Sequence, residues 1–279
     1  MKIALCMHGF IVNGGRQYEA FLAKEYIQRN ILSKGEVDIF FHSWDETGES
    51  HRLASMLYDF KVVEYEKQKS FDQELNLIDV DWFEKNYNRQ SDFYSGNSIF
   101  QTLSFLYSRK KAIELKTKYE KENNFEYDIV ILARTDLGTR GKEHAQAGPY
   151  YVTNINFDPN NDMNFIYAAD WNQHNWGYPD HWFYSNSKNM NIVGQAFDKV
   201  VEYYNPKSEY VYSVTLGWPD SNLNDGFSNE IYKNKEDTTH NLMCFERFHC
   251  IDNHKFYKWF FIDNLLYDKT KFLDITRET

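Results

Sequence analysis

The sequence predicts a single α/β domain with a mixed, mostly parallel central sheet flanked by helices. Short apolar runs rich in β-branched residues occur at residues 3–7, 37–42 and 129–133, and segments with helical periodicity separate them. Strands that alternate with helices are typical of a parallel sheet that is covered on its faces. A length of 279 residues fits one domain of this class.

The first strand, at residues 3–7, ends at His8 and Gly9 and leads through a glycine-containing loop into a helix expected at residues 16–32. Backbone amides of such a loop and a helix N terminus can bind phosphate, and Arg16 would add positive charge. The loop carries neither a G-x-G-x-x-G nor a Walker motif. An ordinary connection between strand and helix is therefore the alternative.

The second strand, at residues 37–42, also ends in polar and aromatic residues, namely His42, Ser43, Trp44 and Asp45. A histidine at the carboxyl end of a parallel strand is either a ligand-binding residue or a structural one. We then expect a helix at residues 50–58 and a strand at 60–65. The segment at residues 71–90 is interpreted as a mobile helical insert.

A long helix is expected to begin at Ser98, which forms a capping box with Gln101, and to lead into the strand at residues 129–133. Arg134 and Asp136 follow that strand, and their spacing directs both side chains to the same side. Ligands of open α/β sheets bind at this end of the strands. One residue could hold a phosphate and the other a metal ion or a sugar hydroxyl; a salt bridge without a ligand is the alternative.

The second half contains a loop expected over the site at residues 138–149, a strand at 165–170, a helix at 190–204, and a helix, a strand and a final helix towards the carboxyl end. The segment between the strand at 165–170 and the helix at 190–204 is rich in aromatic residues and contains Asp180 and His181. An aspartate beside aromatic rings could bind a sugar or accept a proton. A packed aromatic corner with a helix-capping aspartate is the alternative.

The composition argues against several classes of partner. A net charge of −10 disfavours a general nucleic-acid or anionic-membrane surface. The three cysteines have no spacing typical of a zinc site, so we expect reduced thiols and a cytoplasmic protein. No apolar run has the length of a membrane span, which leaves at most a peripheral membrane association.

Four segments together resemble bacterial surface-polysaccharide glycosyltransferases of the GT-A type, in particular the WavE-like proteins of lipopolysaccharide and capsule biosynthesis. They are the opening strand with Gly9 and Arg16, DIFFHSW (38–44), YDIVILARTDL (127–137) and DHWFYSNSKNM (180–190). The resemblance implies a GT-A-like, Rossmann-like domain in which residues 1–137 bind a nucleotide-sugar donor and residues 138–279 bind the acceptor. It also implies that Asp136 holds the donor diphosphate through a divalent cation, Mn²⁺ or Mg²⁺. Arg134 replaces the first of the usual two aspartates. Either Arg134 itself neutralises the diphosphate, or a single carboxylate and a distant side chain hold the ion.

These considerations predict a nucleotide-sugar-dependent glycosyltransferase whose acceptor is a glycan or a lipid-linked glycan. The predicted donor site consists of His8, Gly9, Arg16, His42, Trp44, Asp45, Arg134 and Asp136, with Asp136 as the metal ligand. The predicted sugar-binding residues are Trp171, Trp176, His181 and Trp182. Asp180 is the leading candidate for the base that accepts the acceptor proton, Asp170 is the second, and Asp220 and Asp225 are further candidates. A retaining enzyme would need no such base, and Asp180 would then only position the sugar.

Two other classes of function stay open from the sequence. A non-catalytic sugar-binding protein on the same scaffold would keep the aromatic residues, and the missing first aspartate favours it. Another polysaccharide-modifying transferase, such as one that moves a phosphoryl-type group, would share the acceptor site but use a different donor.

Overall fold

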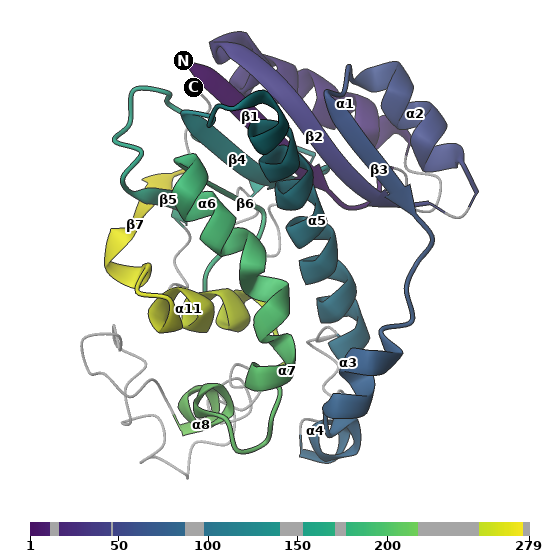
Figure 1. Cartoon of the computed structure of the whole chain (residues 1–279), viewed down its shortest axis with the longest axis vertical. Coiled ribbons are helices and arrows are strands. Elements are labelled where there is room, and N and C mark those ends of the chain that lie inside the picture. Colours follow the sequence, from purple (N-terminus) through teal and green to yellow (C-terminus); the bar gives the residue numbers. More distant parts are fainter. Residues whose placement is uncertain are drawn as a thin grey trace, which may run out of the picture.

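The computed structural model describes residues 1–11, 17–45, 47–86, 98–139, 153–170, 177–216 and 251–275. Its centre is a seven-stranded sheet with the order β3-β2-β1-β4-β6-β5-β7 (Figure 1). The strands are β1 (Lys2–His8), β2 (Glu36–Trp44), β3 (Val62–Glu66), β4 (Ile129–Arg134), β5 (Ile166–Asp170), β6 (Trp182–Ser185) and β7 (Thr270–Asp274).

Six of the strands run in one direction, and β6 alone is antiparallel to its neighbours β4 and β5. This confirms the predicted α/β fold with a mixed, mostly parallel sheet. The carboxyl ends of the six parallel strands therefore lie at one edge of the sheet, together with the amino end of β6. We call this the carboxyl edge.

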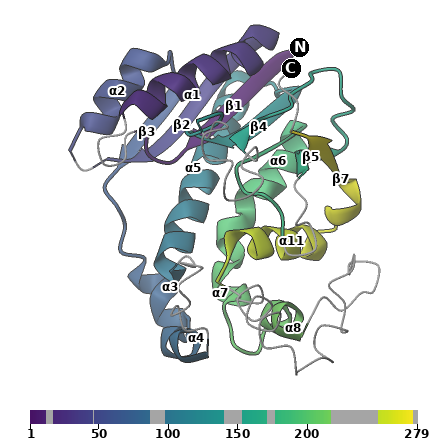
Figure 2. The same cartoon turned by 180° about the vertical axis from the view of Figure 1, so that it is seen from behind.

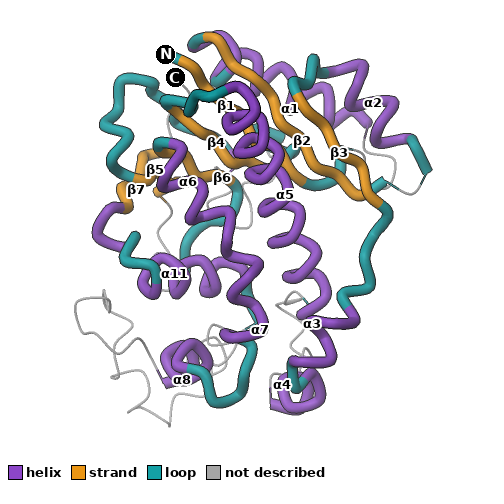
Figure 3. Tube along the Cα trace, viewed as in Figure 1, coloured by secondary structure: helices purple, strands orange, loops and turns teal. Residues whose placement is uncertain are grey.

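Helices cover both faces of the sheet (Figures 1 and 2). The α-helices are α1 (Gln17–Asn30), α2 (Glu49–Leu57), α3 (Asp72–Leu77), α4 (Val80–Asn86), α5 (Ile99–Asn123), α6 (Ser187–Val193), α7 (Val200–Tyr203), α8 (Glu209–Leu216) and α11 (Asn253–Asp263). Short 3₁₀ helices are η1 (Leu32–Lys34), η4 (Gly194–Lys199) and η6 (Tyr267–Lys269). The tube view separates the orange strands from the purple helices that pack on them (Figure 3).

The alternation of side chains along the strands divides the core into two layers. Ile3, Leu5 and Met7 of β1 pack with residues of α1 and α2 on one face. Ala4 and Cys6 point to the opposite face and pack with α5, α6 and α11. Because successive residues of a strand point to opposite faces, His8 belongs to the α5 side.

Helix α5 begins and ends as its residues dictate. Ser98 accepts a hydrogen bond from the Gln101 amide at 2.9 Å, and the Gln101 side chain accepts one from the Ser98 amide at 2.7 Å, which confirms the capping box. Asn124 ends the helix in the left-handed conformation, at φ 53°. The apolar residues Ile99, Leu103, Leu106 and Ile113 of α5 are buried in the core on the face of the sheet that α5 covers.

A buried ion pair joins α5 to α6. Lys116 Nζ lies 2.9 Å from Glu120 Oε2 and donates to Ser187 Oγ at 2.7 Å. Ser187 in turn donates to the other Glu120 oxygen at 2.8 Å. Each charged group in this pair therefore has hydrogen-bonding partners, as a buried pair requires.

Two strands of the sheet, β6 and β7, were not predicted from the sequence. β6 is a four-residue strand that is buried throughout, and its antiparallel pairing with β4 inserts it between β4 and β5. The predicted final helix is present as α11, but β7, which the sequence did not predict, follows it, and the helix and strand predicted before α11 lie outside the described residues. Both strands are short, and each is stabilised by a neighbour that is distant in the sequence.

The other predicted helices are present among the described residues, but their first and last residues differ from the predicted ones. The predicted helix at residues 190–204 is divided into α6, η4 and α7. The segment from residue 71 contains α3 and α4, and Phe71, Ile78 and Phe83 are buried in the core. Residues 87–90 of that segment and most of the predicted loop at 138–149 lie outside the described residues. Among the helices that the structure describes, none has both the length and the hydropathy needed to cross a membrane.

Candidate functional site

The carboxyl edge brings three of the predicted site residues side by side. His8 of β1 lies opposite His42 of β2 on one side and opposite Arg134 of β4 on the other. All three side chains point to the face that α5 covers, because each continues the alternation of buried residues on that face. The parallel pairing of β1 with β2 and β4 therefore brings these three predicted site residues to one edge of the sheet.

Arg134 is bound by two carboxylates. Its Nε and Nη2 donate to Asp136 Oδ1 and Oδ2 at 2.9 and 2.6 Å, which is a two-pronged contact. Its Nη1 lies 3.8 Å from Asp180 Oδ1. The Arg134 and Asp136 side chains are 29% and 31% exposed, whereas Asp180 is buried. Arg134 thus connects a buried carboxylate with one at the surface.

Asp180 is enclosed by polar and charged groups. Asn253 donates to its Oδ2 at 3.3 Å, and Arg109 Nη1 donates to its backbone oxygen at 2.5 Å. Burial would raise the pKa of the Asp180 carboxyl, but His254, Arg134 and Arg109 hold this pKa below its usual range. A carboxylate so stabilised is a weak proton acceptor at neutral pH.

The turn after β1 is tied to the neighbouring strands. Gly9 adopts φ 103°, a conformation that favours glycine, and its amide donates to the His42 carbonyl at 3.2 Å. The hydroxyl of Thr135 donates to the Phe10 carbonyl at 2.6 Å. These contacts hold the β1 turn against the end of β4, beside Arg134.

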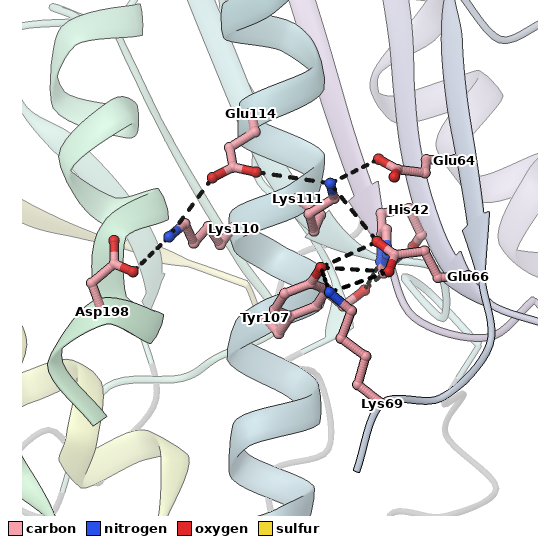
Figure 4. Close-up of polar contacts among 10 residues, drawn as sticks. His42, Glu64, Glu66, Lys69, Tyr107, Lys110, Lys111, Glu114 and Asp198 are labelled. Carbon is pink, nitrogen blue, oxygen red and sulfur yellow. Dashed lines mark hydrogen bonds and ion pairs between the residues drawn. The ribbon is translucent and has the colours of Figure 1, made fainter. Parts of the chain in front are cut away.

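His42 is part of a second polar network, which lies between β2, β3 and α5 (Figure 4). Its Nδ1 is 2.8 Å from Ser108 Oγ, and its Nε2 is 3.3 Å from Glu66 Oε1. Glu66 also contacts Lys69 at 3.5 Å and Lys111 at 3.8 Å. Burial lowers the pKa of His42 to about 4, even though Glu66 opposes this change.

The predicted donor residues Trp44 and Asp45 are used by the fold. The Trp44 ring is buried and stacks on Tyr107 with a centroid distance of 5.3 Å. Asp45 accepts hydrogen bonds from the amides of Thr47, Gly48 and His51 at 3.1, 2.7 and 2.8 Å, and thereby shapes the turn before α2. Both residues therefore have a structural explanation at the carboxyl edge.

The predicted sugar-binding residues have unequal positions. Trp182 is buried on the α1 side of the sheet, where its Nε1 donates to the Asn154 carbonyl at 2.8 Å, so its ring is not presented to a ligand. His181 is buried next to Asp180, with 3.7 Å between His181 Nδ1 and Asp180 Oδ1. Trp171, Trp176 and the donor-site residue Arg16 lie outside the described residues, as do Asp220 and Asp225.

The two candidate bases also differ. Asp170 is exposed at the end of β5, on the carboxyl edge. Asp180 is buried, and it is not the cap of the following helix, because Asn186 accepts the hydrogen bond from the Asn189 amide at 2.9 Å. The capping alternative for Asp180 is therefore replaced by a role as a charge partner of Arg134.

Sequence reasoning missed three residues around Asp180. Arg109 of α5 is buried and its guanidinium lies 4.6 Å from the centroid of the Tyr257 ring. Asn253 and Tyr257 belong to α11, and both are buried as well. Arg109 could have been found, because a lone arginine interrupts the apolar face of α5 between Leu106 and Ile113. No pattern in the neighbouring sequence indicates that Asn253 or Tyr257 lies near Asp180.

The described residues do not assemble a metal site. Within them, no three or more histidine, cysteine, aspartate or glutamate side chains form a group suited to a metal ion. Both carboxylate oxygens of Asp136 face Arg134. A divalent cation would therefore have to compete with Arg134 for Asp136.

No protein-family model, no curated protein and no solved structure matches the chain.

A separate pocket of about 230 Å³ is formed by residues of α7, α8 and α11, among them Glu202, Tyr210 and Trp259. None of the predicted site residues lines it. Its aromatic residues are buried, so they do not offer open ring faces for a sugar to stack on.

Proposed function

We propose that this chain is a glycosyltransferase that moves a sugar from a nucleotide-diphosphate donor to a surface glycan acceptor. The observation that carries the proposal is the meeting of Gly9, Arg134 and Asp136 where β1 and β4 end. The carboxyl edge is where open α/β sheets bind their ligands. The architecture is also compatible with the GT-A-type fold that the sequence resembles.

Arg134 is the residue best suited to the donor diphosphate. A guanidinium group binds phosphate oxygens through the same two-pronged geometry that Arg134 uses on Asp136. Its side chain is 29% exposed and is therefore accessible from solvent. A fixed positive charge at this place would stabilise the diphosphate as it leaves the sugar.

The surroundings of Arg134 and Asp136 favour binding of the diphosphate by Arg134 over binding of a metal ion by Asp136. Asp136 already neutralises Arg134, and no group of three metal-binding side chains accompanies it among the described residues. We therefore assign no step of the transfer to a metal ion. A cation that binds at Asp136 would require Arg134 to exchange that carboxylate for the diphosphate.

The proton of the acceptor hydroxyl is better accepted by Asp170 than by Asp180. Asp170 is exposed on the carboxyl edge, whereas Asp180 is buried and its pKa is low. Asp180 acts by positioning Arg134. A transfer with retention of configuration would need neither carboxylate as a base.

Calorimetric titration with UDP, GDP and CMP, each with and without Mn²⁺, tests this proposal. We expect one nucleoside diphosphate to bind. Arg134→Gln should weaken that binding by about 10- to 100-fold, because a hydrogen bond to a charged group contributes about 1.5–3 kcal/mol. Arg134→Lys keeps the charge but loses the two-pronged contact and should give an intermediate affinity.

Lys110→Gln is the matched control. Lys110 of α5 is also a cation, but it pairs with Asp198, on the other side of α5 from the His42 network (Figure 4). Melting temperatures of all variants would show whether each remains folded. Absence of binding by every nucleotide, or equal binding by wild type and Arg134→Gln, would contradict the proposed function.

A non-catalytic sugar-binding protein on this scaffold is the second candidate. The ion pair between Arg134 and Asp136 favours this second candidate, because the Asp136 carboxylate that would bind the cation of a metal-dependent enzyme is already paired with Arg134. This candidate predicts that free sugars such as glucose, galactose and mannose bind when they are titrated in the same way, whereas nucleoside diphosphates do not bind.

A further inference from the structure

Several buried polar atoms near Asp180 have no hydrogen-bond partner within the part of the chain that the structure describes. They are His8 Nε2, Arg109 Nε and Nη2, His181 Nδ1, Asn253 Oδ1 and Tyr257 OH. They come from β1, from α5, from the residue before β6 and from α11. We call Asp180 and these five residues the Asp180 cluster.

These residues are connected by contacts around Asp180. Arg109 and Asn253 both donate to Asp180, and His181 is its neighbour in sequence. The Arg109 guanidinium lies over the Tyr257 ring and 5.2 Å from the centroid of Phe105, whose ring is 5.2 Å from that of His8. Three elements and the residue before β6 thus contribute, to the region around Asp180, polar atoms that have no hydrogen-bond partner among the described residues.

An ordinary core does not retain such a group of atoms. A buried donor or acceptor without a partner costs about 1–3 kcal/mol, and most buried polar atoms in proteins are paired. The ion pair of Lys116 and Glu120 shows the usual arrangement, in which each charged group is bonded to neighbouring side chains. The Asp180 cluster therefore has hydrogen-bonding capacity that a ligand could use.

The chemistry of the cluster indicates the kind of ligand. Arg109 only donates, Asn253 Oδ1 only accepts, and the Tyr257 hydroxyl can do both. The charges of Arg109 and Arg134 are balanced by those of Asp180 and Asp136, and burial keeps His8 and His181 neutral by lowering their pKa values. A neutral group with several hydroxyls, each a donor and an acceptor, complements such a surface better than an anion does.

We propose that the Asp180 cluster binds the hydroxyls of the sugar that the donor carries. This inference rests on the proposed function, which places the diphosphate at Arg134. Arg134 and Asp136 are the partly exposed groups next to the buried Asp180, so they form the entrance to the cluster. A diphosphate that draws Arg134 away from Asp180 would open this entrance and direct the attached sugar inward.

The test compares each nucleoside diphosphate with its sugar-bearing form. Calorimetry would measure the Kd of UDP against UDP-glucose and UDP-galactose, and of GDP against GDP-mannose, for wild type and Tyr257→Phe. Loss of one hydrogen bond to the sugar should weaken the best nucleotide sugar by about 3- to 10-fold. The Kd of the bare nucleoside diphosphate should stay unchanged.

The melting temperature separates this role from a structural one. Tyr257→Phe removes a hydroxyl that has no partner among the described residues, so it should not lower the melting temperature. Tyr58→Phe, which alters a buried tyrosine on the opposite face of the sheet, is the matched control and should change neither Kd.

The outcomes distinguish the two proposals. If the nucleoside diphosphate binds but Tyr257→Phe leaves the affinity ratio of the two ligand forms unchanged, the cluster does not bind the sugar, and the proposed function stands. If Tyr257→Phe weakens both forms equally, the effect is structural and the inference is overturned. If no nucleotide binds to the wild type, the proposed function fails first and removes the basis of the inference.

Discussion

Acid should destabilise this protein through His42, because burial disfavours the protonated form of its ring. His42 is completely buried and held by Ser108 and Glu66 (Figure 4). Burial lowers its pKa from 6.5 to about 4. Since a pKa difference of one corresponds to about 1.4 kcal/mol, charging His42 in the fold costs roughly 3 kcal/mol more than in the unfolded chain.

The direction follows from the depressed pKa. The fold favours neutral His42, so the full stabilisation is present above pH 6.5, the pKa of the unfolded chain. It is lost as the pH falls from 6.5 to about 4, where the folded protein also takes up the proton. His8 and His181, whose pKa values burial also lowers, add to the same loss.

Urea denaturation of wild type and His42→Gln at several pH values from 7.5 down to 4.5 isolates the contribution of His42. The variant should be less stable at pH 7.5, and the difference from wild type should shrink by roughly 2–3 kcal/mol towards pH 4.5, because the variant has no proton to bind there. Ser108→Ala is the control, since it removes a hydrogen bond from the same network but no titratable group. A difference between wild type and His42→Gln that stays constant across this pH range would refute the reasoning.

Two further predictions concern other buried charges. Lys116→Ala should lower the free energy of unfolding by about 3–5 kcal/mol, because it leaves Glu120 buried without its partner. Lys118→Ala, which removes an exposed ion pair, should lower it by at most about 1 kcal/mol. Urea denaturation of both variants would measure these losses, and equal losses would argue that the Lys116 pair is not buried. Asp180→Asn should lower the melting temperature because it removes the buried carboxylate next to Arg134, whereas Asp170→Asn, once donor and acceptor are known, should reduce turnover by roughly 10²-fold. A thermally normal Asp180→Asn with reduced turnover would restore Asp180 as the base.

Local patterns in the sequence were sufficient for most of the framework. The apolar runs that became β1, β2 and β4 are recognisable because strands buried on both faces carry few polar residues. The capping box at Ser98 was predictable because its hydrogen bonds join residues three apart. The meeting of His8, His42 and Arg134 followed from topology, since parallel strands end at a common edge.

Burial and pairing between distant segments were decided only by the tertiary structure. The sequence by itself determined the α/β class, the order of the elements up to β5 and the position of His8, His42 and Arg134 at strand ends on the carboxyl edge. It did not determine that β6 is antiparallel, that Trp182 faces the core, or that Asp180 lies beside Arg134 with Arg109 and Asn253 around it. The physical reason is that the environment of a side chain, and with it the pKa and the available hydrogen bonds, depends on elements many residues away.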